Sequence, residues 1–366
     1  MQQLHLHEFH NALGARFGTV GGEEVVMDYA DRMAEYDALQ DRVAVIDLSF
    51  RGRFCLTGAD RVRFLHGQVT NDVKRLQTGE GCYAALVNAK GRMESDLNVY
   101  CLSEEILLDF EPGLVETVLK RLEKYIVADD VQVIDVGSLY GVLSIQGPAA
   151  EATLRGTGLF SEYPGGKFKL KRSADSQLGE LYLVNLPRLG TVGFDLFVPV
   201  EALAMVAERV LTAARSVDGR VGGWEAFEMA RIEKGIPRFG MDMDNSNFPQ
   251  ECGIEASAVS YSKGCYIGQE VLNRIHTLGH VNRELRGLRL TDDLEPLPGR
   301  GEKLFHSGKE TGWITSSLAS PRLRQNVGLG FVRKEASELG TELKIRTKDG
   351  ERVVRIVPLP FEQETA

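Results

Sequence analysis

The hydrophobic period of this chain changes at about residue 283, and that change constrains its fold more than any other feature. Before it, three apolar stripes with the helical period alternate with short β-type runs. After it, helical stripes largely disappear, and short β-rich runs alternate with Gly, Pro and Asp turns. A length of 366 residues also exceeds one ordinary core. We therefore predict a mixed helix and strand region over residues 1–282, followed by a small, mostly β domain.

Individual elements can be placed within this outline. Helical stripes begin near Val115, Leu203 and Trp224, and the third is expected to stop at Gly235 because Pro237 follows closely. Strands are expected over four runs and one C-terminal hairpin, whose turn is Asp349-Gly350. The runs are residues 53–56, 142–145 and the hairpin pair 98–102 and 106–110; the C-terminal hairpin joins 343–346 to 353–357.

Charge and cysteine usage exclude several classes of protein. The net charge of −9 lacks the basic excess typical of nucleic-acid binders, so no DNA partner is expected. The five cysteines are odd in number and form no C-x-x-C pair, which argues against a disulfide framework and a stable metal site. Without a signal-like N-terminus or a run of ~20 apolar residues, a cytoplasmic protein outside the membrane is expected. Its oligomeric state is unpredicted, with a monomer as the default.

The segment from Lys263 to Glu270 reads as a loop that enters a helix. This places Cys265 just before, or at, a helix N-terminus, where unpaired N–H groups and the helix dipole favour a thiolate. Lys263 adds a nearby positive charge, so Cys265 is a candidate reactive thiol. The alternative is a small buried cysteine that only packs.

Three further side chains have chemistry that the pattern alone leaves open. Asp96, in Glu94-Ser95-Asp96, is either a solvated turn acid or a hydrogen-bond acceptor for an amine or pteridine nitrogen. Asp195 lies in a predicted strand, where it either faces solvent or holds a ligand. Arg231 lies on the apolar face of its helix and is expected to pair with a carboxylate of the protein or of a ligand.

Alternating lysines form a fourth feature. Lys167, Lys169 and Lys171 alternate in a predicted edge strand. They either discourage aggregation at that edge or bind the acidic tail of a polyglutamylated folate.

Read together, these spacings resemble a known family. The eight residues from Lys263 to Glu270, which we call the octet, are similar to the K-G-C-[FY]-x-G-Q-E signature of YgfZ-type proteins, and Arg274 follows them. The matched positions are Lys263, Gly264, Cys265, Tyr266, Gly268, Gln269 and Glu270. Other stretches resemble the glycine-cleavage T-protein superfamily along nearly the whole chain. They include residues 70–72, 88–96, 191–195, 231–237, 249–251 and 312–321.

The resemblance implies an α+β fold of three domains arranged as a clover-leaf ring with a central folate channel and a C-terminal β-barrel domain. Residues 1–282 would form the T-protein-like folate-binding region from two interleaved α+β subdomains, about 1–50 with 140–282, and 51–139. Residues 283–366 would form the barrel.

The resemblance also assigns site residues around tetrahydrofolate or a one-carbon derivative of it. Asp96 matches the acid beside the reacting nitrogens of the folate, Asp195 the acid that grips the pterin, and Arg231 the arginine near that acid. Asn88, in the matched stretch 88–96, is also expected to bind the cofactor. Here Ser95 stands where the T-proteins usually show the first of two adjacent acids.

Three functions follow from the resemblance. The main one is a tetrahydrofolate-binding, YgfZ-like protein that supports assembly or maintenance of iron–sulfur enzymes through Cys265, with iron–sulfur client or assembly proteins as partners. The alternative is an aminomethyltransferase that moves a one-carbon unit from a lipoyl carrier to tetrahydrofolate, with Asp96 at the reacting nitrogens. A non-catalytic folate-binding scaffold is the third, and whether the chain is an enzyme stays open.

Overall fold

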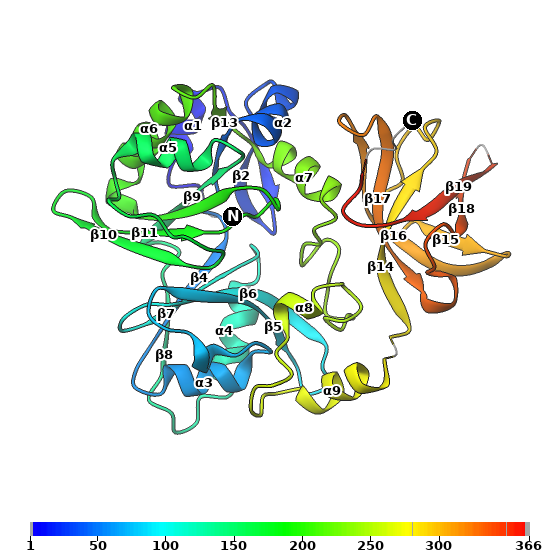
Figure 1. The fold of residues 1–366 in the computed structure, drawn as a ribbon, viewed down its shortest axis with the longest axis horizontal. Coiled ribbons are helices and arrows are strands. Elements are labelled where there is room, and N and C mark those ends of the chain that lie inside the picture. Colours follow the sequence, from blue (N-terminus) through cyan, green and yellow to red (C-terminus); the bar gives the residue numbers. More distant parts are fainter. Residues whose placement is uncertain (1–2, 280, 349, 363–366) are drawn as a thin grey trace. The chain divides into compact units, whose positions relative to one another are not determined.

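The chain combines helices, three sheets of two, five and six strands, and a closed barrel in the computed structural model, which describes residues 3–279, 281–348 and 350–362 (Figure 1). It divides into two compact units. The first contains Met1–Leu86, Ser95–Ala230 and Lys263–Tyr266; the second contains Val87–Glu94, Arg231–Ser262 and Ile267–Ala366.

A six-stranded sheet organises one half of the first unit. Its strand order is β10-β11-β12-β9-β3-β13, and only β13 pairs in parallel, with β3. Helices α5 and α6 cover it, packing Leu154 and Val206 against strand residues such as Leu196. The elements are β3 (Ala44–Asp47), β9 (Tyr140–Gln146), α5 (Ala150–Thr157), β10 (Leu170–Asp175), β11 (Gly179–Asn185), β12 (Gly193–Pro199), α6 (Val200–Arg215) and β13 (Arg220–Val221).

A five-stranded sheet of order β5-β6-β7-β4-β8 organises the other half. Helices α3 and α4 pack on it through Leu65, Val118 and Leu122, which meet strand residues such as Phe54 and Leu108. The elements are β4 (Gly52–Thr57), α3 (Arg61–Gln68), the 3-10 helix η1 (Val73–Arg75), β5 (Glu80–Val87), β6 (Met93–Cys101), β7 (Ile106–Phe110), α4 (Val115–Glu123) and β8 (Gln132–Asp135).

A closed barrel forms most of the second unit, in the order β14-β17-β16-β15-β18-β19. Its core is aliphatic and includes Leu288, Ile314 and Val354. The elements are β14 (Arg283–Leu290), β15 (Lys303–His306), β16 (Lys309–Ser320), β17 (Gln325–Arg333), the 3-10 helix η2 (Lys334–Ala336), β18 (Glu342–Thr347) and β19 (Gly350–Val357).

The remaining elements are short. A hairpin and two helices belong to the N-terminal part, and three helices lie between β13 and the barrel. They are α1 (His7–Ala12), β1 (Arg16–Val20), β2 (Glu23–Asp28), α2 (Arg32–Asp41), α7 (Trp224–Glu233), α8 (Glu255–Ala258) and α9 (Gln269–Leu278).

The predicted elements agree with this arrangement. The three helical stripes are α4, α6 and α7, and the predicted strands fall on β4, β6, β7 and β9. The C-terminal hairpin is β18 with β19, although Asp349 of its turn lies outside the described residues. The mixed fold and the C-terminal β-barrel are therefore confirmed. The boundaries of the two interleaved subdomains stay a prediction.

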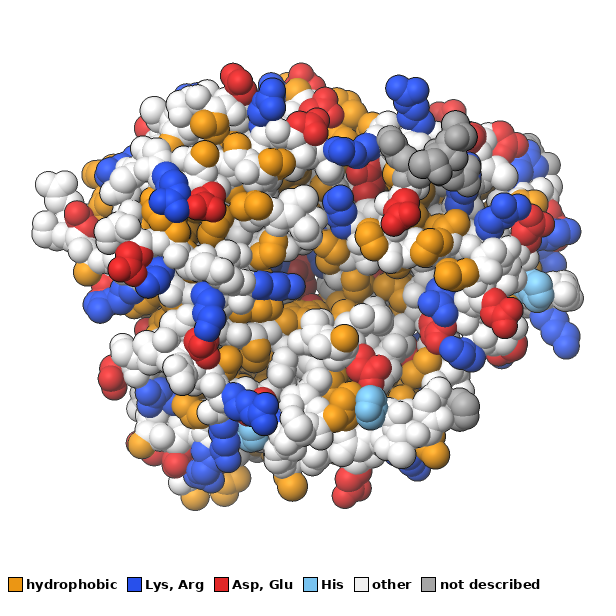
Figure 2. All heavy atoms as spheres, in the orientation of Figure 1, with side chains coloured by type: hydrophobic (Ala, Val, Ile, Leu, Met, Phe, Trp, Pro, Cys, Tyr) orange, Lys and Arg blue, Asp and Glu red, His pale blue; other side chains and the backbone are white. Residues whose placement is uncertain are grey.

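Charged side chains of both signs are interspersed over the face shown in Figure 2. Among the described helices, none is both long enough and apolar enough to cross a membrane.

Candidate functional site

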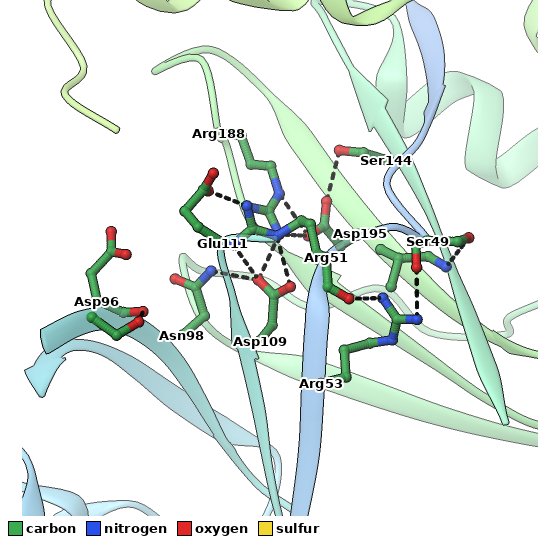
Figure 3. Close-up of polar contacts among 12 residues, drawn as sticks. Ser49, Arg51, Arg53, Asp96, Asn98, Asp109, Glu111, Ser144, Arg188 and Asp195 are labelled. Carbon is green, nitrogen blue, oxygen red and sulfur yellow. Dashed lines mark hydrogen bonds and ion pairs between the residues drawn. The ribbon is translucent and has the colours of Figure 1, made fainter. Parts of the chain in front are cut away.

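Five charged side chains gather between the two sheets of the first unit (Figure 3). Asp109 lies on β7 and Asp195 on β12, and both are fully buried. Arg51 precedes β4, Glu111 follows β7, and Arg188 lies in the loop between β11 and β12. We call these five residues the charge cluster. Because an unpaired buried charge is strongly unfavourable, each member needs a partner of opposite sign.

Asp109 is the centre of the cluster because two arginines share it. Arg51 donates through Nε to Oδ1 at 2.8 Å and through Nη2 to Oδ2 at 3.2 Å, and its Nη1 donates to Glu111. Arg188 donates from Nη2 to Asp109 Oδ2 at 2.9 Å. Burial alone would raise the pKa of Asp109, but the two arginines more than offset this and hold it well below its usual value.

Asp195 is engaged on both oxygens. Ser144, on the neighbouring strand β9, donates its hydroxyl to Oδ1 at 2.7 Å. Arg188 donates to Oδ2 from Nε at 2.8 Å and from Nη2 at 2.6 Å. The solvent-facing alternative for Asp195 is therefore wrong: it lies at zero exposure on β12 and its nearest cation is Arg188.

Asp96 lies on β6, beside the cluster and two residues from Asn98, which shares its face of the strand. Asn98 donates to Asp109 Oδ2 at 2.8 Å. The Tyr83 hydroxyl donates to Asp96 Oδ2 at 2.7 Å, whereas Oδ1 is buried with no hydrogen-bond partner among the described residues. Burial, with a smaller contribution from the charge of Glu111, raises the pKa of Asp96 to about 6.

A second polar atom on the same strand face lacks a partner within the described part of the chain. Tyr100, two residues beyond Asn98, is fully buried and its hydroxyl makes no hydrogen bond. Burial and then Asp109 and Asp195 raise its pKa well above the usual value, so the phenol stays protonated. The face of β6 thus presents one unpaired acceptor and one unpaired donor on either side of Asn98.

The other two expected cofactor-binding residues fall in the second unit. Asn88 shapes the turn between β5 and β6: its Oδ1 accepts the backbone N–H groups of Lys90 and Arg92 at 2.9 and 3.2 Å. Arg231 is buried, and its guanidinium donates to Asp242 and, at 3.1 Å, to Ser316. Of the two partners left open for Arg231, the structure thus shows a carboxylate of the protein.

Cys265 and Lys263 differ in their surroundings. Cys265 is exposed, so the buried alternative is wrong, and it lies three residues before Gly268, the N-cap of α9. Lys263 is buried, and its ammonium donates to the carbonyl oxygens of His66, Val69 and Asn71 at 2.6, 2.6 and 2.8 Å. Burial lowers the pKa of Lys263 to about 8. Its charge therefore anchors the end of α3.

The other residues of the octet have mainly structural surroundings. Tyr266 is buried, with the Lys263 ammonium 4.8 Å from its ring centroid. Gly268 has a φ of +84°, and Gln269 is the first residue of α9. Glu270 and Arg274 are exposed on that helix.

The predicted edge strand is confirmed in part: β10 lies at the edge of the six-stranded sheet but begins at Leu170, so only Lys171 of the three lysines belongs to it. Two of the lysines already have acidic neighbours, because Lys169 pairs with Glu80 and Lys171 with Glu162. Such exposed pairs contribute little stability. Within residues 3–279, 281–348 and 350–362, no group of three or more His, Cys, Asp or Glu side chains could hold a metal ion.

Sequence reasoning missed the charge cluster apart from Asp195. One observation could have revealed Asp109, because it is an acid within the apolar run 106–110, and buried acids need partners. Arg51 and Arg188 could not be paired with it from the sequence, since they lie 58 and 79 residues away along the chain.

A solved structure shares the fold of this chain over nearly its whole length. The aminomethyltransferase T of the glycine cleavage system from Bartonella henselae superposes with a TM-score of 0.89 at 22% identity, over 99% of this chain and 98% of that one. This match defines the fold as that of a T-protein.

Sequence comparison then gives the family. Residues 6–263 match the GCVT N-terminal domain, and residues 283–362 match the glycine cleavage T-protein C-terminal barrel domain. An aminomethyltransferase from Rubrobacter xylanophilus is 30% identical over 99% of this chain and 94% of its own length. One from Halalkalibacterium halodurans is 27% identical over 99% and 98%. The chain belongs to the glycine-cleavage T-protein family.

Proposed function

We propose that this protein binds tetrahydrofolate beside Asp96 and transfers a one-carbon unit to it, as an aminomethyltransferase. One observation carries the proposal: Asp96 keeps a buried carboxylate oxygen without a partner among the described residues. An unpaired buried acceptor costs about 1–3 kcal/mol, so a ligand that donates a hydrogen bond to this oxygen would recover that cost on binding. The names of the relatives add support.

The residues on this face of β6 fit a folate. A pterin carries N–H groups that a carboxylate accepts, and Asp96 Oδ1 is an unused acceptor. The Tyr100 hydroxyl offers an unused donor two residues past Asn98. Asp195, the second expected pterin contact, lies in the same unit. Tetrahydrofolate would supply the nitrogen atoms that accept the carbon.

Asp96 is suited to proton transfer at neutral pH. Its pKa of about 6 leaves the carboxylate ionised at pH 7 yet more basic than an ordinary aspartate. Tyr83 holds Oδ2 at 2.7 Å, which fixes the carboxylate and leaves Oδ1 to accept a proton. We infer that Asp96 both orients the ligand and serves as the general base.

The test measures methylene-tetrahydrofolate formation from a carrier-borne aminomethyl group. The wild-type protein should form product, and Asp96→Asn should lower kcat by about 100-fold, within the range typical for a general base. Glu104→Gln removes the same charge at an exposed turn and should keep full activity. Absence of product with the wild-type protein would overturn the transferase proposal.

A second function is favoured by a different observation. Cys265 is exposed, whereas the nearby Lys263 is buried, so the thiol is accessible to a partner. We propose as the second candidate that the protein supports iron–sulfur enzymes through Cys265, as the YgfZ-type octet suggests. Its partners would be iron–sulfur client or assembly proteins, and its compartment the cytoplasm.

The thiol hypothesis is tested in cells with an iron–sulfur reporter enzyme. Cys265→Ala should lower reporter activity, while Cys101→Ala, a change at a half-buried cysteine, should not. Unchanged reporter activity with folded Cys265→Ala protein would remove this candidate and leave the transferase.

A further inference from the structure

We propose that Arg188 is a latch that occupies Asp195 in the ligand-free protein and leaves it when a pterin binds. Arg188 would then set folate affinity without being a ligand of the folate. The inference rests on the proposed folate binding and adds to it a competition within the protein for the same carboxylate.

The contacts of Asp195 define the closed latch. Two N–H groups of Arg188 converge on Oδ2, at 2.8 and 2.6 Å, and Ser144 holds Oδ1 at 2.7 Å. A pterin that uses Asp195 needs acceptor positions on the carboxylate, and those of Oδ2 are taken by a charged donor. Charge-assisted bonds are stronger than neutral ones, so the pterin cannot simply share this oxygen.

Arg188 has a second carboxylate to hold it when the latch opens. Its Nη2 also donates to Asp109 Oδ2 at 2.9 Å. The guanidinium can therefore rotate off Asp195 without becoming a buried, unpaired charge. In the open state Asp109 would keep both arginines, while Asp195 would keep only Ser144.

The backbone around Arg188 is anchored, so only the side chain needs to move. The Arg188 N–H donates to Gln146 Oε1 at 3.1 Å, and the next residue, Leu189, is buried. Gln146 in turn donates to Ser144 Oγ and to the Leu186 carbonyl. These contacts hold the loop between β11 and β12 against β9, the strand whose Ser144 also contacts Asp195.

A separate observation indicates that a ligand completes this region. The Tyr100 hydroxyl is fully buried and unpaired among the described residues, and Asp109 and Asp195 both act on it electrostatically. Once Arg188 turns towards Asp109, a ligand on Asp195 would lie beside a donor that still needs an acceptor. Pterins carry ring nitrogens and a carbonyl that accept such a bond.

The latch predicts a measurable loss of affinity in the wild-type protein. A ligand that binds only the open state has its apparent Kd raised by the reciprocal of the open fraction. If the latch is open in about one molecule in ten, Arg188→Gln should bind tetrahydrofolate about tenfold more tightly. Glutamine is too short and too weak a donor to hold Asp195 in the same way. Arg155→Gln, an exposed arginine of α5, is the matched control and should leave Kd unchanged.

Calorimetric titration of tetrahydrofolate into these proteins tests the latch. Tighter binding to Arg188→Gln supports it, and in the Asp195→Asn background the same change should give no gain. Equal or weaker binding to folded Arg188→Gln overturns the latch while leaving folate binding intact. Lack of binding to wild type and variant alike overturns the proposed function and the latch together.

NMR of the wild-type protein tests the latch without any change at Asp195. The Arg188 Nε–H group should give a slowly exchanging resonance in the ligand-free protein, assigned by its loss in Arg188→Lys. Saturating tetrahydrofolate should shift this resonance as the group leaves Asp195. A resonance that stays unchanged at saturation, with binding seen by calorimetry, would overturn the proposal.

Discussion

Asp96 differs from the carboxylates of the charge cluster because it forms no ion pair with any residue that the structure describes. Asp109 is held by two arginines, Glu111 by Arg51, and Asp195 by Arg188. Asp96 has only the Tyr83 hydroxyl, and its second oxygen is unpaired among the described residues. Its raised pKa follows from this difference, because burial is offset by fewer favourable interactions.

This difference predicts an unusual effect of Asp96→Asn on stability. The pKa rises from about 3.9 in the unfolded chain to about 6 in the folded protein, so the folded state binds the proton more tightly. The contribution of Asp96 to the free energy of unfolding therefore falls as pH rises from about 4 to 6, and stays low above that. At pH 8 Asp96→Asn should raise the free energy of unfolding by about 1–2 kcal/mol, and at pH 4 it should have little effect.

Urea unfolding at the two pH values measures this effect. Trp224 lies in the first unit and Trp313 in the second, so a Trp313→Phe background restricts the fluorescence signal to the unit that contains Asp96. Glu104→Gln should be neutral at both pH values. A loss of stability at pH 8 in Asp96→Asn would show that the carboxylate is structural.

Of the residues at the site, the sequence predicted two acids but not the arginines that neutralise the cluster. Asp96 and Asp195 were predicted because each lies inside a short motif that resembles the T-proteins. The two arginines that neutralise the cluster lie outside any motif, and their partners are distant along the chain. The partner of Arg231 was left open because an arginine on an apolar helix face needs an anion but does not identify it.

At the scale of elements, Lys263 and Gly268 of the octet stabilise different helices. Lys263 donates to three carbonyl oxygens at the end of α3, all within the first unit. Gly268, the N-cap of α9, lies in the second unit, and a Cβ there would lie 2.6 Å from the Asn88 carbonyl oxygen. Lys263 and Gly268 of the octet therefore each have a folding role independent of catalysis.

Lys263→Met should destabilise the first unit by about 1–3 kcal/mol. The change removes a buried charge but leaves three carbonyl oxygens without their donor, and the lost hydrogen bonds outweigh the relief. Urea unfolding in the Trp313→Phe background measures it. The exposed Lys74→Met is the control and should change stability by less than about 0.5 kcal/mol. Equal stability of the two variants would contradict the anchoring role.

Two glycines of the octet should respond differently to alanine. Gly268→Ala combines a left-handed backbone with a contact to the Asn88 carbonyl, so it should cost about 2 kcal/mol or more. Gly264→Ala places its Cβ 3.9 Å from the nearest atom, on His66, and should be nearly neutral. Thermal unfolding of the two variants compares them. A harmless Gly268→Ala would mean that the turn before α9 readily rearranges.

The hydrophobic period and the turn residues predicted several elements because both are local features of the sequence. Helices α4, α6 and α7 follow the 3.6-residue stripe, and the β18–β19 hairpin follows its turn. The order of strands in the six-stranded sheet could not be predicted, because β3 pairs with β9, nearly 100 residues later. Such pairing depends on long-range packing that no local pattern records.

At the scale of the whole molecule, the chain has the domain content of its family: a T-protein N-terminal domain and a C-terminal barrel. Product formation from a carrier-borne aminomethyl group and the iron–sulfur reporter separate the two proposed functions. Both proposals share the prior claim that tetrahydrofolate binds beside Asp96. Binding would also stabilise the protein, by about 2.7 kcal/mol at a ligand concentration 100 times Kd.

The most direct test of that claim is calorimetric titration of tetrahydrofolate into the 366-residue protein at pH 7.5. The account predicts saturable one-to-one binding to the wild type and to Glu104→Gln, and at least tenfold weaker binding to Asp96→Asn. Absence of saturable binding to the wild type, or equal affinity in Asp96→Asn, would contradict it.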